Sequence, residues 1–314
     1  MLPESWCDAA ACCGRRPQAF PGNQADKACY GTAMITRDVR RRADAAAATF
    51  DDADFVHALT RKGLLDRLQP IVVDASLVVD LGTATGSAMR SLASRFRGGR
   101  IVGVDASHAM LLRAHRKQGR LARKWLVQAD ACRLPFADHS VDVVFANMLL
   151  PYLDAPLKLF TEVSRVLRRD GVFAFSTLGP DSLQELRHAW PRTGAQAPPS
   201  PFLDMHDVGD AVVRSGLRDP VLDVDRLTVT YPDAAAVFRD LTAMGGRNSR
   251  YSGSGGLVGG ARYAAMLDAL ERCRKDGVLS FDLELVYGHC WGSGRSAGTG
   301  EVRIDPAGIA RRRG

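Results

Sequence analysis

Hydrophobic and polar positions follow two alternating periods between residues 54 and 190. Short runs of β-branched and other apolar residues, such as Leu77–Leu81 and Val141–Ala146, are typical of strands buried on both faces of a sheet. Between such runs, apolar residues recur at helical spacing, which predicts amphipathic helices. This alternation predicts a parallel, doubly wound α/β sheet with right-handed crossovers. The other strands are expected at Arg100–Val104, Trp125–Gln128 and Val172–Thr177, and the helices at 54–69, Ser87–Arg95, His108–Lys117, Leu157–Leu167 and Leu183–Trp190.

The pattern changes after residue 200. A helix is expected over His206–Ser215, followed by two long strand-like stretches, Pro220–Tyr231 and Ser280–Trp291. No crossover pattern accompanies these stretches, so we expect an antiparallel pair at one edge of the sheet. The insertion between them, at about 232–278, contains two helical segments joined by a glycine-rich linker. It is either a cap over a substrate site or a passive surface excursion.

Both ends of the chain lack this periodicity. Residues 1–33 mix Pro, Gly and Cys and are interpreted as a disordered extension or as the result of a misassigned start. The folded domain is expected to span residues 34–294, and residues 295–314 form a C-terminal tail.

Composition narrows the class of protein. Hydrophobic residues make up 46% of the 314 positions, which suffices for a packed core. No apolar run approaches the roughly 18 residues of a membrane span, and no signal sequence is evident, so a cytoplasmic protein without membrane contact is expected. The net charge of +7 suits an acidic partner, but no aromatic–basic interleaving favours nucleic acid. The seven cysteines form no C-x-x-C pair, so no metal site is expected.

The most informative motif follows the strand Leu77–Leu81. There the chain reads Asp80-Leu81-Gly82-Thr83-Ala84-Thr85-Gly86 and enters a helix-like segment. Such a strand–turn–helix can bring backbone N–H groups to a carboxylate or phosphate at a helix N-terminus. A dinucleotide fingerprint would need G-x-G-x-x-G, and Ala84 and Ser87 occupy two of its glycine positions. Read as G-x-A-x-G after an acidic residue, the loop resembles the first motif of S-adenosylmethionine-dependent methyltransferases.

Polar residues follow three other predicted strands. Asp105 ends the second strand, where a carboxylate can accept both hydroxyl groups of a ribose. Asp130 and Ala131 follow the third and are candidates for the adenine edge, although a surface aspartate is equally compatible. Asn147 ends the fourth and is expected either to bind cofactor or substrate or to cap the next turn.

From about Val39 onward the chain resembles the malonyl-[acyl-carrier protein] O-methyltransferases of biotin synthesis, which are class I methyltransferases. The resemblance rests on 175–187 (FSTLGPDSLQELR), 202–210 (FLDMHDVGD), 227–232 (LTVTYP), 286–291 (VYGHCW) and 301–304 (EVRI). It implies a seven-stranded, Rossmann-like sheet with an antiparallel edge and a helical cap. It also implies methylation of the free carboxylate of malonyl-acyl-carrier protein or malonyl-CoA, with S-adenosylmethionine as donor, no metal, and acyl carrier protein as partner. The implied cofactor residues are Asp80, Gly82, Thr83, Ala84, Gly86, Asp105, Ala106, Met110, Asp130, Ala131 and Asn147.

Two departures from the family pattern stand out. Ala84 replaces the family's central glycine, and its methyl group is tolerable if its φ is negative. Ala43 and Ala45 replace an early Phe and Arg, and Phe50 replaces a Tyr. A phenolic substrate contact at position 50 is therefore not available to this chain.

A carboxylate is already ionised at neutral pH, so the implied reaction needs no general base and we assign no catalytic residue. An arginine is expected to hold the substrate carboxylate. Arg187 is the first candidate and Arg247 the second, unless both are solvated helix residues, and Tyr152 completes the substrate-binding set. The basic run between Arg113 and Lys124 is either a docking patch for the acidic carrier or a solvated helix face.

Three alternative functions remain open at this point. Residues 202–231 and 241–245 are also similar to a complex I assembly factor linked to arginine hydroxylation. Because the first five strands are generic, another small-molecule methyltransferase, for example one acting on a quinone, fits them as well. A non-catalytic scaffold that binds a carrier protein is the third.

Overall fold

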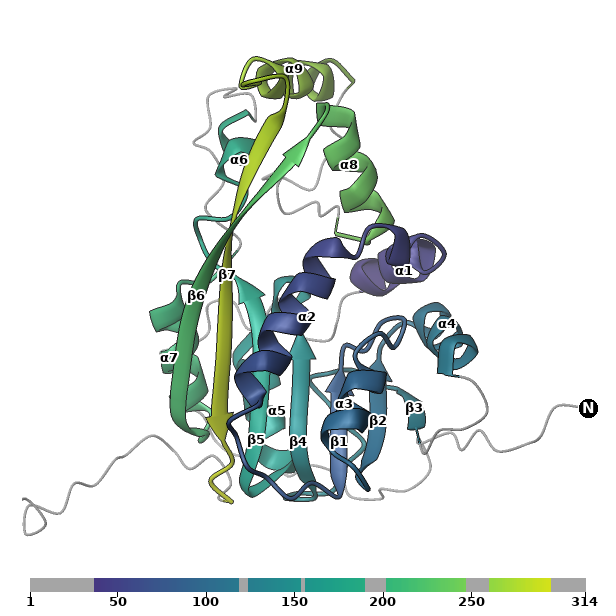
Figure 1. Ribbon diagram of the computed structural model, residues 1–314, viewed down its shortest axis with the longest axis vertical. Coiled ribbons are helices and arrows are strands. Elements are labelled where there is room, and N and C mark those ends of the chain that lie inside the picture. Colours follow the sequence, from purple (N-terminus) through teal and green to yellow (C-terminus); the bar gives the residue numbers. More distant parts are fainter. Residues whose placement is uncertain (1–36, 119–123, 154–155, 190–201, 247–259, 295–314) are drawn as a thin grey trace, which may run out of the picture.

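The computed structural model describes residues 37–118, 124–153, 156–189, 202–246 and 260–294. Within these residues, seven strands form one sheet in the order β3-β2-β1-β4-β5-β7-β6 (Figure 1). The strands are β1 (Leu77–Leu81), β2 (Arg100–Asp105), β3 (Lys124–Gln128), β4 (Val141–Asn147), β5 (Leu167–Leu178), β6 (Arg218–Tyr231) and β7 (Leu279–Trp291). The α-helices are α1 (Arg37–Ala46), α2 (Phe55–Leu68), α3 (Met89–Arg95), α4 (His108–Gln118), α5 (Pro156–Val166), α6 (Gln184–Ala189), α7 (Met205–Arg214), α8 (Ala234–Ala243) and α9 (Gly260–Glu271). Two short 3-10 helices are η1 (Phe50–Asp52) and η2 (Leu150–Tyr152).

The first five strands are parallel, whereas β7 runs antiparallel to both β5 and β6. Strand β4 is buried from Val141 to Ala146, as expected of a central strand covered on both faces. Consecutive parallel strands need a crossover, and the helices between them supply it. The predicted doubly wound sheet with an antiparallel edge is therefore confirmed.

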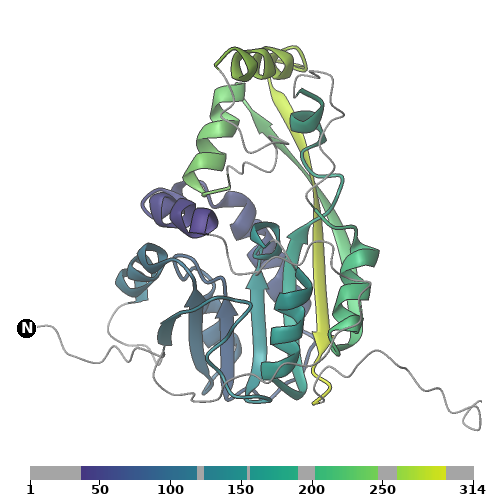
Figure 2. The same ribbon diagram turned by 180° about the vertical axis from the view of Figure 1, so that it is seen from behind.

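Two hydrophobic cores cover the two faces of the sheet. On one face, Val78 of β1 packs with residues of α2 and α3. On the other, Val79 and Leu81 pack with residues of α5 and α7. Figure 1 shows α2 and α3 in front of the sheet, and Figure 2 shows α5 and α7 on the opposite side. The period-2 alternation of side chains along β1 thus divides its apolar residues between both cores.

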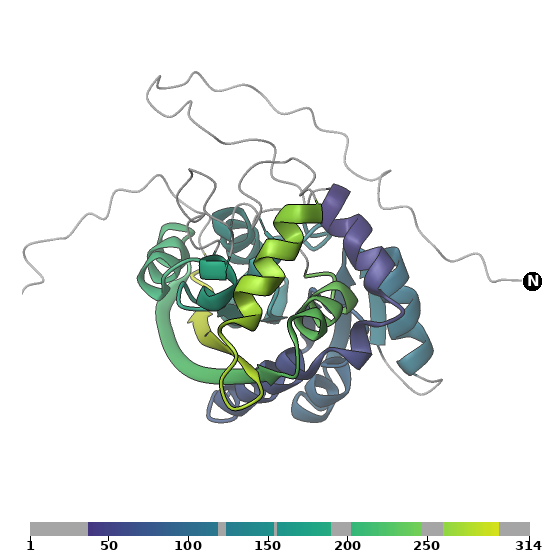
Figure 3. The ribbon, with the colours of Figure 1, turned by 90° about the horizontal axis from the view of Figure 1, so that it is seen from above.

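Strands β6 and β7 continue past the carboxyl end of β5. The pairing of β5 with β7 ends at Leu178 and Leu285, but β6 and β7 remain paired as far as Tyr231 and Leu279. Helices α8 and α9 lie at this end, over the carboxyl ends of the parallel strands (Figures 1 and 3). A separate small core that includes Phe281 joins them to α6. The two helices expected in the insertion are thus present above the sheet.

Most predicted elements are present within two residues of their expected bounds, and β5 is the main difference. It begins at Leu167 rather than Val172, because Leu167 already pairs with Val141 of β4.

Residues 1–36 and 295–314, together with the linker 247–259, lie outside the described residues. The expectations for both ends of the chain and the bounds of the insertion therefore stay predictions. None of the described helices combines the length and apolar character that a membrane crossing requires.

Candidate functional site

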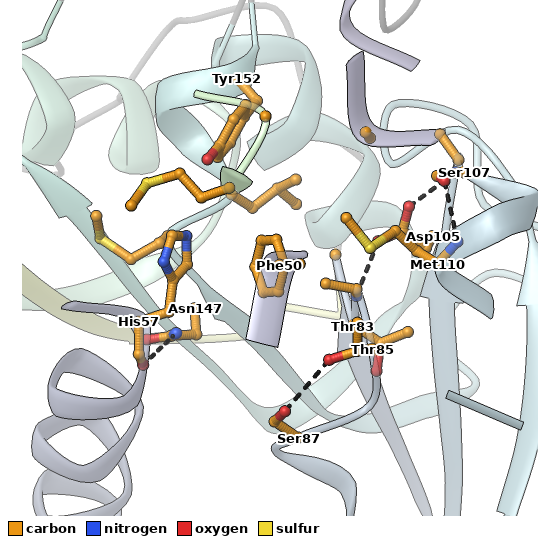
Figure 4. Close-up of a pocket in the computed structure, with 18 of the residues that line it drawn as sticks. Phe50, His57, Thr83, Thr85, Ser87, Asp105, Ser107, Met110, Asn147 and Tyr152 are labelled. Carbon is orange, nitrogen blue, oxygen red and sulfur yellow. Dashed lines mark hydrogen bonds between the residues drawn. The ribbon is translucent and has the colours of Figure 1, made fainter. Parts of the chain in front are cut away.

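The carboxyl ends of β1, β2 and β4 open into a cavity of ≈ 110 Å³. Asp80, Asp105 and Asn147 end or nearly end these three strands and line the cavity. This position is where open parallel sheets bind ligands. Ten of the residues that line the cavity are labelled in Figure 4. Of the predicted cofactor residues, those that line the cavity are Asp80, Gly82, Thr83, Ala84, Asp105, Ala106, Met110 and Asn147.

The loop after β1 holds its shape through its own backbone. The N–H groups of Gly82 and Thr83 donate to Val104 O at 2.8 and 3.0 Å, and Gly86 N–H donates to Thr83 O at 2.8 Å. The Ala84 N–H donates to Asp105 Oδ2 at 2.9 Å. The expectation that N–H groups of this turn meet a ligand anion stays a prediction, and the four N–H groups named here are already used by the fold. They bind β1 to β2 and position the Asp105 carboxylate.

Three residues of this loop, Gly82, Ala84 and Gly86, have left-handed backbone conformations. Gly82 has a φ of 72°, and a Cβ there would lie 3.0 Å from Leu149 Cδ1. Ala84 has a φ of 47°. On the sequence alone, Ala84 is expected to be tolerated if its φ is negative. Its φ is positive, and an L-residue is strained in this region. Its side chain packs partly against the core formed by α1 and Met110.

Asp105 accepts hydrogen bonds on both carboxylate oxygens. Oδ2 accepts from Ala84 N–H, and Oδ1 accepts from Ser107 N–H at 2.8 Å. Burial raises the pKa of Asp105, and the backbone N–H donors oppose this effect. A carboxylate has about four lone-pair sites, and the backbone donors of Ala84, Ser107 and Ala106 leave capacity for a ligand hydroxyl group. The site therefore suits a diol such as a ribose.

Asp80 lies deeper and is only 2% exposed. Its Oδ2 accepts from Thr83 Oγ1 at 2.5 Å. Burial raises its pKa to about 7, and the neighbouring Asp105 charge adds to the increase, while Thr83 and Arg61 lower it. A cation bound in the cavity would favour the ionised form.

An N-terminal segment, α1 and η1, covers the cavity, whereas the sequence pointed only to a possible family substrate contact at position 50. Ser107 Oγ donates to Asp44 Oδ1 of α1 at 2.6 Å, and Thr85 Oγ1 donates to Asp51 Oδ1 of η1 at 2.6 Å. Phe50 of η1 is buried in the cavity lining. These contacts join residues 34 to 63 positions apart in the chain, so no local pattern could reveal them.

The basic run proposed for carrier docking takes part in these contacts. Arg113 donates to the carbonyl groups of Ala47 and Ala48, and Lys117 Nζ lies 2.5 Å from Asp51 Oδ1. These two side chains thus fasten the covering segment to α4, and residues 119–123 of the run lie outside the described residues.

A second cavity of ≈ 120 Å³ lies beneath α8. It is mostly apolar, with side chains from the protruding parts of β6 and β7 and from the cap helix, such as Val229, Leu241 and Phe281. The two cavities are neighbours, because six residues line both of them: Val39, His57, Met148, Tyr152, Met244 and Gly245.

Three polar side chains stand at or near the junction of the cavities (Figure 4). Burial lowers the pKa of His57 to about 4 and raises that of Tyr152 to about 12, so both are neutral at pH 7. Asn147 donates from Nδ2 to His57 O at 3.0 Å and accepts from Ser176 Oγ at 2.9 Å. Asn147 therefore connects β4 to α2 and β5. Neither of its expected roles, ligand binding or capping of the next turn, included these contacts.

Other predicted residues lie elsewhere. Gly86, Asp130, Ala131 and Arg187 are absent from the linings of both cavities, and the carboxylate of Asp130 accepts from Cys132 N–H. Arg187 donates to Pro180 O at 2.9 Å. Arg247 lies outside the described residues. Their assigned roles stay predictions.

Several cavity residues were missed in the sequence, among them Arg42, His57, Arg61, Ser107 and Met244. They come from loops and helices outside the strand ends, so only the tertiary contacts assemble them. In the described part of the chain, no three His, Cys, Asp or Glu side chains are grouped so that they could hold a metal ion.

Comparison with known proteins agrees with this geometry. The methyltransferase domain family matches residues 79–175. Two solved structures share the fold. YcgJ of Bacillus subtilis is 14% identical with a TM-score of 0.53, and the match covers 75% of this chain and 98% of that chain. Phosphoethanolamine N-methyltransferase 2 of Haemonchus contortus is 16% identical with a TM-score of 0.51, and the match covers 79% of this chain and 57% of that chain.

Curated relatives are more similar. A protein of Halorhodospira halophila named malonyl-[acyl-carrier protein] O-methyltransferase is 40% identical over 88% of this chain and 96% of its own length. Relatives with the same enzyme name in Laribacter hongkongensis and Coxiella burnetii are 38% and 34% identical, over 81% and 87% of this chain and 88% and 95% of their own lengths. The chain belongs to the malonyl-[acyl-carrier protein] O-methyltransferase family.

Proposed function

We propose that this protein transfers a methyl group from S-adenosylmethionine to the free carboxylate of malonyl-acyl-carrier protein, an early step of biotin synthesis. The observation that carries the proposal is the pair of neighbouring cavities. One is lined by buried carboxylates at the strand ends, and the other is an apolar chamber under the cap. Relatives at up to 40% identity that bear this enzyme name support the choice of substrate.

The first cavity fits S-adenosylmethionine on the chemistry of its residues. Asp105 has acceptor capacity left beside its backbone donors, and this capacity suits a ribose hydroxyl group. Met110 and Ala106 offer apolar surface for the adenine ring. The carboxylate of Asp80 can balance the positive charge of the methionyl part of the cofactor. When bound, the cofactor supplies an electrophilic methyl group on a sulfonium ion.

The residues of this chain then position the nucleophile and exclude water. The substrate carboxylate needs no base, since its ordinary pKa lies near 4. Tyr152 at the junction is neutral, so it can donate a hydrogen bond and is not a phenolate that competes for the methyl group. His57 is neutral as well, so it adds no positive charge beside the sulfonium. The apolar walls under the cap keep water from the reacting atoms, and orientation supplies much of the rate acceleration.

The partner proposed here is acyl carrier protein in its malonyl form. The net charge of +7 favours association with an acidic protein. Since Arg113 and Lys117 already hold the N-terminal segment, a docking patch would have to use other basic side chains, such as the exposed Arg116.

Mass spectrometry of malonyl-carrier protein incubated with the purified enzyme and S-adenosylmethionine tests the function. We expect a mass gain of one methylene group that alkaline hydrolysis reverses, and rescue of a biotin-requiring strain that lacks its own methyltransferase. No mass gain on malonyl-carrier protein, or an equal gain on carrier protein without the malonyl group, would contradict the proposal.

A further inference from the structure

One charged side chain lines the apolar cavity beneath the cap within the described residues, and it is Arg42 of α1. The other lining groups are aliphatic, aromatic or neutral, as with Leu241 of α8 and Phe281 of β7. Arg42 is half-buried, and a guanidinium beside so much apolar surface is better accommodated when an anion compensates its charge. The position of Arg42 therefore needs an explanation.

Arg42 keeps an unused donor at this position. Its Nε atom is buried and has no hydrogen-bond partner among the described residues. The neighbouring Arg41 differs, because its side chain is 82% exposed and lies 3.4 Å from Asp38 Oδ1. Arg61, which lines the first cavity, is engaged by Asp54 Oδ2 at 3.5 Å. Arg42 thus lines the second cavity and has an Nε–H donor that no described residue satisfies.

Arg42 also lies close to the passage between the cavities. Its positive charge acts on the hydroxyl group of Tyr152 and favours the ionised form, against the larger effect of burial. Tyr152 lines both cavities, as do His57 and Met148. An anion held by Arg42 would therefore lie next to the cofactor cavity rather than at the far end of the chamber.

We propose that Arg42 binds one carboxylate oxygen of the acyl substrate and so selects thioesters with a free terminal carboxylate over neutral acyl thioesters; the proposal rests on the function proposed above. The second oxygen stays free to attack the methyl carbon. The new O–CH3 bond forms as the S–CH3 bond breaks, its electron pair stays on sulfur, and no proton moves. The ester formed is neutral, so the ion pair with Arg42 disappears and product release is favoured.

The test compares Arg42→Gln with Arg41→Gln, a matched change on the exposed face of the same helix. Calorimetry measures the Kd of malonyl-CoA and of acetyl-CoA in the presence of S-adenosylhomocysteine, and kinetics measure KM and kcat with malonyl-CoA. We expect Arg42→Gln to raise the Kd of malonyl-CoA by about 10- to 100-fold. The Kd values of acetyl-CoA and S-adenosylhomocysteine should stay within about twofold of those of the wild type. Arg42→Lys should restore part of the preference, because it keeps the charge without the planar fork.

Three results would overturn the proposal. In the first, the preference for malonyl-CoA over acetyl-CoA survives in Arg42→Gln, whether or not it disappears in Arg187→Gln. In the second, Arg42→Gln weakens the binding of both thioesters equally, which would indicate a structural role. In the third, the wild-type protein has no such preference. If wild type binds malonyl-CoA selectively through Arg42 but forms no methyl ester, the proposed function fails while the Arg42 assignment stands.

Discussion

The two cavities that meet at Met148 and Tyr152 are built in different ways. The cofactor cavity, as we call the first cavity after the role proposed for it, is formed by strand ends and short loops. Backbone N–H groups of Ala84 and Ser107 hold its Asp105 carboxylate. The cap cavity is formed by apolar side chains from α1, α8, β6 and β7. Backbone hydrogen bonds fix polar groups to a narrow geometry, whereas apolar contacts are non-directional. Changes in the first region should therefore disturb cofactor binding, and changes in the second should alter substrate selection.

The largest effect is expected for Asp105→Asn. Asparagine offers one carbonyl oxygen where Asp105 now accepts two backbone N–H donors, and it also removes the charge that strengthens ribose contacts. We expect the Kd of S-adenosylmethionine to rise by about 100-fold or more, measured by calorimetry. The control is Asp66→Asn, an exposed residue paired with Lys62 on α2. Near-normal affinity in Asp105→Asn would remove this residue from the cofactor site.

The pH dependence of cofactor binding should be the next largest effect. Burial raises the pKa of Asp80 to about 7, so the carboxyl group is increasingly protonated below that pH. A cationic ligand prefers the carboxylate, so affinity should rise by up to about tenfold per pH unit as pH increases toward 7, and level off above it. His57, with a pKa of about 4, stays neutral near pH 7.

Asp80→Asn identifies the group responsible for this pH dependence. An amide oxygen can still accept from Thr83 Oγ1, but it does not titrate. The variant should bind S-adenosylmethionine more weakly, with a flatter pH profile between about pH 5 and pH 7. An unchanged slope in titrations of both proteins would assign the pH dependence to another group.

A smaller and more selective effect is expected for Leu241→Ser in the cap. This change removes apolar surface from the second cavity and leaves the first untouched. The KM for malonyl-CoA should rise by about 5- to 10-fold, while the Kd of S-adenosylmethionine stays within about twofold. Arg239→Ala, on the same helix with a 67% exposed side chain, is the control. An equal rise in the KM for malonyl-CoA and in the Kd of S-adenosylmethionine would show that the two regions are not independent.

The smallest expected effect concerns the loop itself. Ala84→Gly relieves the left-handed strain at a φ of 47°, but it also gives the unfolded chain more freedom. The free energy of unfolding should rise by less than about 1 kcal/mol in urea denaturation. Ala265→Gly, at an exposed position in the interior of α9, should lower it by about 0.5–1 kcal/mol. A destabilised Ala84→Gly would mean that packing of the Ala84 methyl group outweighs its backbone strain.

Much of the fold could be predicted because its signals are local. The run Leu77–Leu81 is a strand with the bounds expected, and α4 differs from its expected range only at its last residue. The acids Asp80 and Asp105 were also evident, because parallel strands bring their carboxyl ends to one edge. The positive φ of Ala84 and the internal use of the loop's N–H groups were not evident, since both depend on how β2 lies beside the loop.

By itself, the sequence determined the order of strands and helices, the acidic strand ends and the family resemblance, because periodicity and motif spacing act over short stretches of chain. The tertiary structure decided that α1 covers the cofactor cavity, that Asn147 ties strands to α2, and that Arg42 rather than Arg187 lines the apolar chamber. Those outcomes depend on contacts between segments distant in the sequence. Such contacts are set by the packing of whole elements, which no local pattern encodes.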